Sequence, residues 1–183
     1  DVAVKSVKGN AAPQFGYHSA ISAKQDAVKW VQVDLGASME IDKVMLMPCY
    51  DDFNKLGAGF GFPVRFKVEV SDDPLFQKGV VLMWRRHDET FMQDFANPGL
   101  HAFTTNGTKG DFKGRFVRVT AVKLAPRLND YIFALAEMRV LDESGKNLAA
   151  GAQVAALDRI EAAPRWAGKN LVDGHHPLPP DTS

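Results

Sequence analysis

Apolar and polar residues alternate in several short segments of the chain, which is the pattern of half-buried β-strands. The clearest case is 64–71, where Phe66, Val68 and Val70 alternate with charged residues. Seven segments show this alternation or a short apolar run, and we expect a strand in each: 30–36, 41–47, 64–71, 80–84, 100–105, 115–122 and 132–141.

The stretches between these segments carry glycine, proline and aspartate, which favour turns. Asp72, Asp73 and Pro74 close one predicted strand, and Gly145 follows the last one. Short alternating strands joined by such turns predict an all-β sandwich in which most neighbouring strands are antiparallel. One stretch differs, because 149–163 is rich in Ala, Leu and Glu and predicts a helix that Pro164 would end.

Length and charge narrow the classes of protein. The chain has 183 residues, enough for one domain, with or without an appendage, whose core needs no disulfide or metal. Its 22 basic and 22 acidic residues balance, whereas a nucleic-acid-binding domain usually carries a basic excess, so we expect no nucleic-acid partner. Cys49 is the single cysteine, which excludes an internal disulfide. No apolar run approaches the ~18 residues that span a bilayer, and we expect no membrane partner.

Five sequence motifs follow one another along the chain: WVQVDLG (30–36), IDKVML (41–46), FKVEVSD (66–72), RFVRV (115–119) and ALAEMRV (134–140). Together they resemble the discoidin family, also called the coagulation factor 5/8 type C domain, which overlaps the galactose-binding-like carbohydrate-binding modules. The resemblance covers residues 1–143. It implies a jelly-roll β-sandwich of about eight mainly antiparallel strands that binds a ligand and has no catalytic activity.

Residues 144–183 form a C-terminal extension in this interpretation. Two stretches of it, ALDRIEAAPRW (156–166) and NLVDG (170–174), resemble the opening segment of a discoidin module. Two interpretations follow. The extension packs on the sandwich, or it is the start of a second similar module. The first and last residues of the chain also suggest a piece of a longer protein.

Three long segments outside the predicted strands are expected to be loops: 9–29, 50–63 and 123–131. Long loops without regular structure are uncommon in compact domains and are often functional. The resemblance implies that loops of this kind form the ligand site at one end of the sandwich. We therefore look for ligand-binding residues in these three segments.

Tyr50, Asp51 and Asp52 lie where the second loop leaves a predicted strand. An aromatic face stacks on the C–H groups of a sugar, and fixed polar groups orient its hydroxyls, so these three are candidate ligand-binding residues. The alternative is a turn whose aspartates cap backbone amides. Phe60 lies in the glycine-rich stretch that follows, and it either projects from the loop to bind ligand or packs beneath it.

The third loop carries Arg127, Asn129, Asp130 and Tyr131. Arginine and asparagine side chains hydrogen-bond hydroxyl groups or acidic substituents, so these four are candidate ligand-binding residues. The alternative is ordinary loop polarity facing solvent. His18 in the first loop is a further candidate, and the alternative there is an exposed histidine.

Glu137 matches a late glutamate of the family, and the resemblance implies that it is a ligand of a structural calcium ion. The family usually carries Asp-Gly and then Thr-x-Trp ahead of the strand at Trp30. Here residues 19–26 read SAISAKQD, and that motif is missing. The expected cofactor is therefore none, or a calcium ion held in part by Glu137.

The sequence shows no pattern typical of a nucleophile elbow or a zinc-protease helix, so we expect no catalytic activity. The expected function is a carbohydrate-binding module that binds polysaccharide or oligosaccharide for a larger protein that is secreted, periplasmic or at the cell surface. One alternative is a structural or protein-interaction module that packs against other domains of its parent protein. Another is a membrane-surface module that inserts Phe60.

Overall fold

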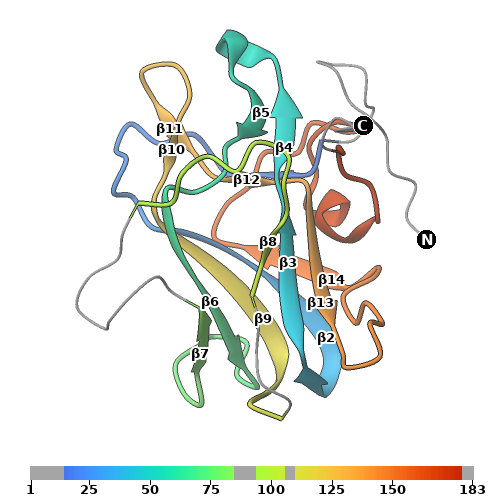
Figure 1. Ribbon diagram of the computed structural model, residues 1–183. Helices are drawn as coiled ribbons and strands as arrows, with labels where there is room; N and C mark the ends of the chain where they lie inside the picture. Colours follow the sequence, from blue (N-terminus) through green and yellow to red (C-terminus); the bar gives the residue numbers. More distant parts are fainter. Residues whose placement is uncertain (1–14, 85–93, 106–109, 179–183) are drawn as a thin grey trace.

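Strands dominate the architecture. The computed structural model describes residues 15–84, 94–105 and 110–178, and Figure 1 shows their arrangement. Residues 9–14 of the expected first loop lie outside the described residues. The largest sheet contains five strands in the order β14, β2, β9, β6 and β7. Their bounds are Gln153–Ala156, Lys29–Ile41, Phe112–Lys123, Arg65–Ser71 and Val81–Trp84.

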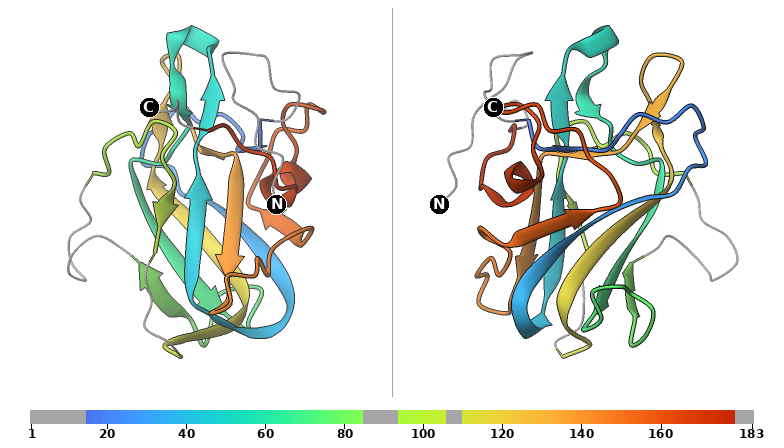
Figure 2. Two further views of the ribbon diagram at one scale, coloured as in Figure 1. Left: turned by 45° about the vertical axis from the view of Figure 1, so that its right-hand side comes forward. Right: turned by 180° about the vertical axis from the view of Figure 1, so that it is seen from behind.

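A second sheet contains three strands, β13 (Glu137–Leu141), β3 (Lys43–Met47) and β8 (Phe103–Thr104). Figure 2 shows the two sheets facing each other, with the C-terminal segment along one side. Neighbouring strands in both sheets are antiparallel. The prediction of an all-β jelly-roll sandwich with about eight mainly antiparallel strands is thereby confirmed.

The alternation of apolar and polar residues explains the core. Val31 and Val33 of β2 pair with Val119 and Val117 of β9, and all four side chains are fully buried because alternate residues of a strand point to the same face. Leu46 reaches the same apolar cluster from the three-stranded sheet. Burial of such a side chain contributes about 1.5–3 kcal/mol, so this cluster holds the two sheets together.

Three short strand pairs lie toward one end of the sandwich (Figure 1). They are β4 (Cys49–Asp51) with β5 (Gly57–Phe60), β10 (Ala125–Pro126) with β11 (Tyr131–Ile132), and β1 (Tyr17–His18) with β12 (Ala134–Leu135). Segments 50–63 and 123–131 are therefore hairpins, and the expectation that they lack regular structure is wrong. Asn54 and Asn129, both with φ of 51°, allow the tight reversals, because asparagine tolerates the left-handed region.

The described part of the segment after Leu141 packs on the sandwich. The predicted helix at 149–163 is wrong, because β14 instead pairs with the edge of β2, and sheet pairing overrides a weak helix preference. Farther along, the 3-10 helix η3 (Gly168–Val172) places Leu171 in the main apolar core. No helix within the described ranges is long and apolar enough to cross a membrane.

Candidate functional site

The β4–β5 and β10–β11 hairpins contact each other at one end of the sandwich. The 3-10 helix η2 (Phe53–Lys55) forms the tip of the first hairpin. Asn54 Nδ2 donates a hydrogen bond of 2.7 Å to the carbonyl oxygen of Arg127, and the guanidinium carbon of Arg127 lies 4.6 Å from the centroid of the Phe53 ring. These contacts join two segments that are far apart in the sequence into one surface.

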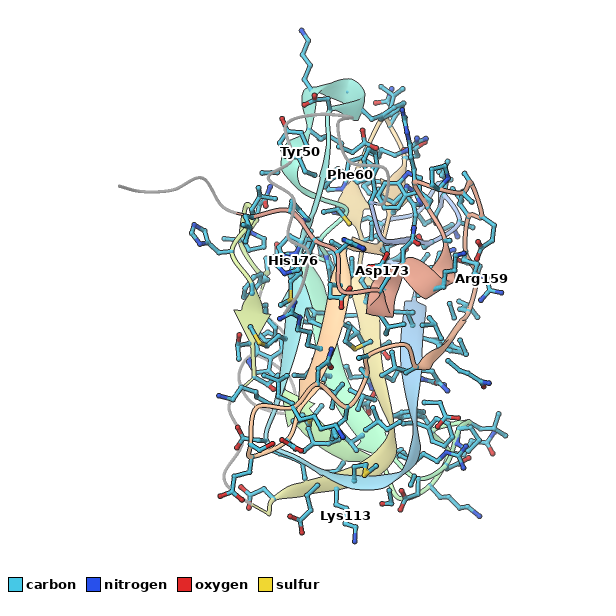
Figure 3. The ribbon with its side chains drawn as sticks, turned by 90° about the vertical axis from the view of Figure 1, so that its right-hand side faces the viewer. Tyr50, Phe60, Lys113, Arg159, Asp173 and His176 are labelled. Atoms are coloured by element: carbon cyan, nitrogen blue, oxygen red, sulfur yellow. The ribbon has the colours of Figure 1, made fainter. Side chains whose placement is uncertain are left out.

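The first hairpin is organised by its own side chains. The Tyr50 hydroxyl donates to Asp52 Oδ1 at 2.9 Å, and the Phe53 N–H donates to Asp51 Oδ1 at 2.9 Å. Tyr50 and Asp51 are half-buried, while Asp52 is exposed. The turn interpretation of Asp51 is therefore correct in geometry. Figure 3 shows Tyr50 toward the end of the molecule opposite Lys113.

The second hairpin is closed by an ion pair. Arg127 Nε and Nη2 donate to the two carboxylate oxygens of Asp130 at 3.0 and 2.7 Å. Asp130 Oδ1 also accepts the Leu128 N–H at 3.0 Å. The bonds from Arg127, together with that amide, lower the pKa of Asp130. The arginine is thereby held in a fixed orientation with its charge largely compensated.

His18 lies next to both hairpins. It is 4 % exposed, and its Nδ1 lies 2.6 Å from the carbonyl oxygen of Ser19. Burial lowers the pKa of His18, and Arg127, Asp51 and Asp130 are all close enough to modify that pKa further. The structure therefore brings together candidates from all three expected loops. The alternative of an exposed histidine is wrong, because the sandwich and the C-terminal segment cover the ring.

Phe60 does not project from its hairpin. Its side chain is 4 % exposed, and its ring centroid lies 5.8 Å from those of both Trp166 and His18. The prediction of Phe60 as an exposed ligand-binding or membrane-inserting residue is wrong. Phe60 instead fills an apolar cluster under the hairpins with residues such as Cys49 and Ile132.

The remaining candidates lie at the edge of the surface. Asn129 is exposed at the tip of the second hairpin, where it takes the left-handed conformation. Tyr131 is half-buried against the main core, and its backbone exchanges hydrogen bonds of 2.8 and 2.9 Å with Ser22. Asn129 is therefore accessible to a ligand at the tip, and Tyr131 also supports the hairpin.

Phe53 belongs to the cluster 50–53 that the sequence singles out, but it is not among the candidate residues, and Asn54 was missed. Phe53 is 41 % exposed and carries the Arg127 guanidinium on its ring, which makes it the exposed aromatic side chain of the hairpin tip. Its signal in the sequence is its position directly after Tyr50-Asp51-Asp52. Asn54 gave no signal, because its contact with Arg127 exists only when the two hairpins meet.

Glu137 is fully buried and faces the C-terminal segment. Both of its carboxylate oxygens accept the Gly174 N–H, at 3.0 and 3.1 Å. Burial, followed by the nearby carboxyl group of Asp173, raises the pKa of Glu137 to about 8. Figure 3 shows Asp173 on the tail at mid-height of the sandwich, well away from Tyr50.

These two carboxylates would hold a calcium ion, since calcium prefers oxygen ligands. Among the described residues, however, no three His, Cys, Asp or Glu side chains gather so that they could hold a metal. Glu137 and Asp173 would therefore need backbone oxygens to complete the coordination. Calcium at Glu137 stays a prediction.

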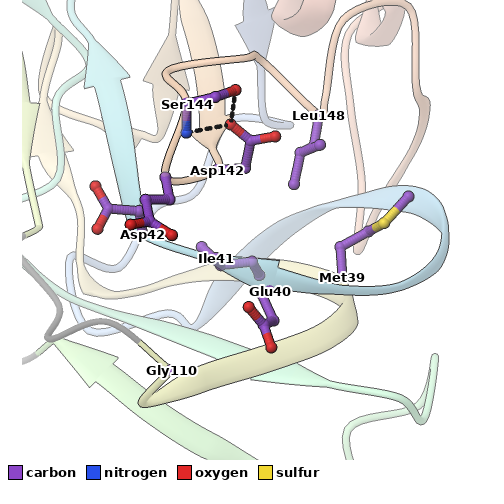
Figure 4. Close-up of a pocket in the computed structure, with 9 residues that line it drawn as sticks. Met39, Glu40, Ile41, Asp42, Gly110, Asp142, Ser144 and Leu148 are labelled. Carbon is purple, nitrogen blue, oxygen red and sulfur yellow. Dashed lines mark hydrogen bonds between the residues drawn. The ribbon is translucent and has the colours of Figure 1, made fainter.

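A cleft of about 590 Å³ lies at the opposite end of the sandwich (Figure 4). Glu40, Asp42, Asp142 and Glu143 are among the residues that line it. Asp142 Oδ1 accepts hydrogen bonds from the backbone N–H and hydroxyl of Ser144 at 2.9 and 2.6 Å, so this carboxylate shapes the turn. None of the candidates from the sequence lines this cleft, and we assign it no ligand.

Comparison with solved structures returns carbohydrate-binding modules. CBM32-1 of a family 31 glycoside hydrolase from Clostridium perfringens is 20% identical, with a TM-score of 0.47, over 72% of this chain and 80% of that chain. Chitosan-binding module 1 of a chitosanase/glucanase from Paenibacillus sp. IK-5 is 17% identical, with a TM-score of 0.45, over 67% and 74%. No family model and no curated protein matches the chain. These similarities are too low to carry an argument about the ligand.

Proposed function

We propose that this chain is a non-catalytic carbohydrate-binding module of a larger protein and that it binds glycan on the surface formed by the two hairpins and His18. One observation carries the proposal. Asp51, Arg127, Asp130 and His18 come from three separate segments and converge at one end of the sandwich, next to the exposed ring of Phe53. An aromatic side chain beside fixed polar groups is the composition of a sugar site.

The polar groups have the chemistry to orient hydroxyls. Arginine has five N–H donors, and the ion pair with Asp130 uses two of them. The carboxylates of Asp51 and Asp52 accept hydrogen bonds. Because Asp130 compensates the charge of Arg127, the surface suits a neutral glycan. A single site of this kind binds weakly, and neighbouring modules of the parent protein would add avidity.

A structural or protein-interaction module is the second candidate. The observation that favours it is the packing of Phe60 on Trp166 of the chain's own tail, since a buried aromatic at this position serves the fold. In that case the partner would be another domain of the parent protein. Under either proposal we place the parent protein outside the cytoplasm, as a secreted, periplasmic or cell-surface protein.

The test is affinity electrophoresis of the chain in gels that contain galactan, xylan, laminarin, alginate or chitosan. We expect retardation by at least one polysaccharide, and Arg127→Ala and Tyr50→Ala should each reduce it. The matched control is Arg115→Ala, because Arg115 forms a similar two-bond ion pair with Asp34, at 2.7 and 2.9 Å, outside the two hairpins.

The outcomes separate the two candidates. Retardation that Arg127→Ala abolishes and Arg115→Ala leaves intact supports a sugar module with its site on the hairpins. Equal loss in both variants would indicate a general effect of removing an ion pair. A folded chain that none of the five polysaccharides retards favours the structural module.

A further inference from the structure

The C-terminal segment holds the backbone on both sides of His18. The Ile160 N–H donates to the carbonyl oxygen of His18 at 2.8 Å. The carbonyl oxygen of Asp158 accepts from the Tyr17 hydroxyl at 3.0 Å, and its carboxylate accepts from the Ala20 N–H at 2.8 Å. The short strand that carries His18 is therefore fixed by one stretch of the tail.

Trp166 of the same segment covers the His18 ring. The two ring centroids are 4.8 Å apart with an interplanar angle of 75°. Trp166 is 9 % exposed and also packs edge-on against Phe15 at 5.3 Å. Its backbone is held in place, because Trp166 and Ala162 exchange hydrogen bonds of 2.8 and 3.2 Å. The indole is thus a fixed wall beside the imidazole.

The other contacts of His18 give its ring a defined role. A carbonyl oxygen accepts, so the 2.6 Å contact with Ser19 places the proton on Nδ1. In the neutral ring Nε2 is then an acceptor, and under the proposed function it is the ring atom that would accept a hydrogen bond from a sugar hydroxyl. Rotation of the ring would exchange the two nitrogens, and the walls formed by Trp166 and Phe60 oppose it.

We propose that Trp166 is a positioning residue of the candidate glycan site, acting through His18, so that the C-terminal segment completes the site as well as the fold. The effect of Trp166 on glycan binding rests on the proposed function. The effect of Trp166 on the His18 ring is independent of the proposed function. Trp166 excludes water from one side of the imidazole and fixes the ring orientation, and both effects follow from the contacts above.

The test uses the full chain with Trp166→Ala and Trp166→Phe. The first readout is the pH titration of His18 followed by NMR, with His18→Gln to assign its signal. We expect Trp166→Ala to raise the pKa of His18 toward its ordinary value of about 6.5, because water then reaches the ring. We expect Trp166→Phe to restore most of the original titration, since it keeps an aromatic wall.

The second readout is retardation in the five polysaccharide gels. We expect Trp166→Ala to weaken binding about tenfold, as the loss of one well-oriented hydrogen bond would, with substantial rescue in Trp166→Phe. Val172→Ala is the control, because Val172 belongs to the same tail but packs in the main core. It should lower stability without changing either readout.

Three results would overturn the proposal. They are an unchanged His18 titration in a folded Trp166→Ala variant, a titration shift of the same size in Val172→Ala, and polysaccharide binding that both variants weaken equally. If Trp166→Ala does not fold, Trp166→Leu replaces it, and the same three results apply. If the unaltered chain binds none of the polysaccharides, the proposed function fails, while the His18 titration still decides whether Trp166 positions the ring.

Discussion

The guanidinium of Arg127 stacks on the ring of Phe53 with 4.6 Å between the guanidinium carbon and the ring centroid. The contact crosses from one hairpin to the other, and the Asn54 side chain bonds the Arg127 carbonyl oxygen beside it. An arginine held over an aromatic ring and against a carboxylate has little freedom to rotate. The relative position of the two hairpins, and hence the shape of the candidate site, depends on this pair.

Phe53→Ala should weaken glycan binding roughly two- to tenfold, because the substitution removes the exposed aromatic face of the site, which is worth about 0.5–1.5 kcal/mol. Stability should change by less than about 1 kcal/mol, since the ring is largely outside the core. Affinity electrophoresis and urea unfolding measure the two effects. Phe76→Ala is the control, because Phe76 also lies 4.2 Å under an arginine, Arg118, but outside the two hairpins. If Phe53→Ala and Phe76→Ala lose the same amount of binding, the assignment of Phe53 to the glycan site is contradicted.

The contribution of His18 to the free energy of unfolding should fall as the pH drops below about 6.5. Burial lowers the pKa of His18 in the folded state, whereas the unfolded chain has the ordinary value of about 6.5. The stabilisation is therefore complete above about 6.5 and is lost as the pH falls through the folded-state pKa, because only the unfolded chain takes up the proton at first. Urea unfolding at several pH values between 7.5 and 5 measures this change in the free energy of unfolding.

Two variants isolate the contribution of His18. His18→Gln cannot titrate and should flatten this part of the pH dependence. The control His101→Gln removes an exposed histidine and should leave the pH dependence as it is. If the free energies of unfolding of His18→Gln and of the unaltered chain change in parallel on acidification, His18 does not contribute to the pH dependence.

Leu171→Ala should lower the free energy of unfolding by about 2–5 kcal/mol, because it leaves a cavity in the main core. Leu157→Ala should cost less than about 0.5 kcal/mol, since Leu157 is 52 % exposed on the same segment. Urea unfolding monitored by tryptophan fluorescence compares them. A small effect of Leu171→Ala, similar to that of Leu157→Ala, would show that the tail is dispensable for the fold.

Calcium at Glu137 would raise the melting temperature. An ion bound to the folded state alone, at about a hundred times its Kd, stabilises by about 2.7 kcal/mol, and its binding would release the proton that Glu137 holds near neutral pH because of its raised pKa. Thermal unfolding in calcium and in EDTA measures the effect, and Glu137→Gln should abolish it. The same melting temperature in calcium, magnesium and EDTA would remove calcium from this position.

The local pattern of the sequence indicated the strands of the two sheets with the exception of β14. Alternation at 64–71 predicted β6 (Arg65–Ser71) almost to the residue, because a strand with one buried face repeats every two residues whatever the rest of the chain does. That inference needs only neighbouring residues. The placing of Asp51, Arg127 and Asp130 in a ligand site at one end of the sandwich is instead what the discoidin resemblance implies, and it stays a proposal.

Only the tertiary structure decided which of the candidates face solvent. Phe60 and Phe53 lie in the same glycine-rich hairpin, yet Trp166 from the distant tail buries Phe60, while Phe53 stays exposed under Arg127. The stretch at 149–163 has a composition suited to a helix, but the open edge of β2 supplies hydrogen-bond partners that favour a strand. Long-range packing of this kind cannot be read from the local alternation of apolar and polar residues, because each contact joins residues that are far apart in the sequence.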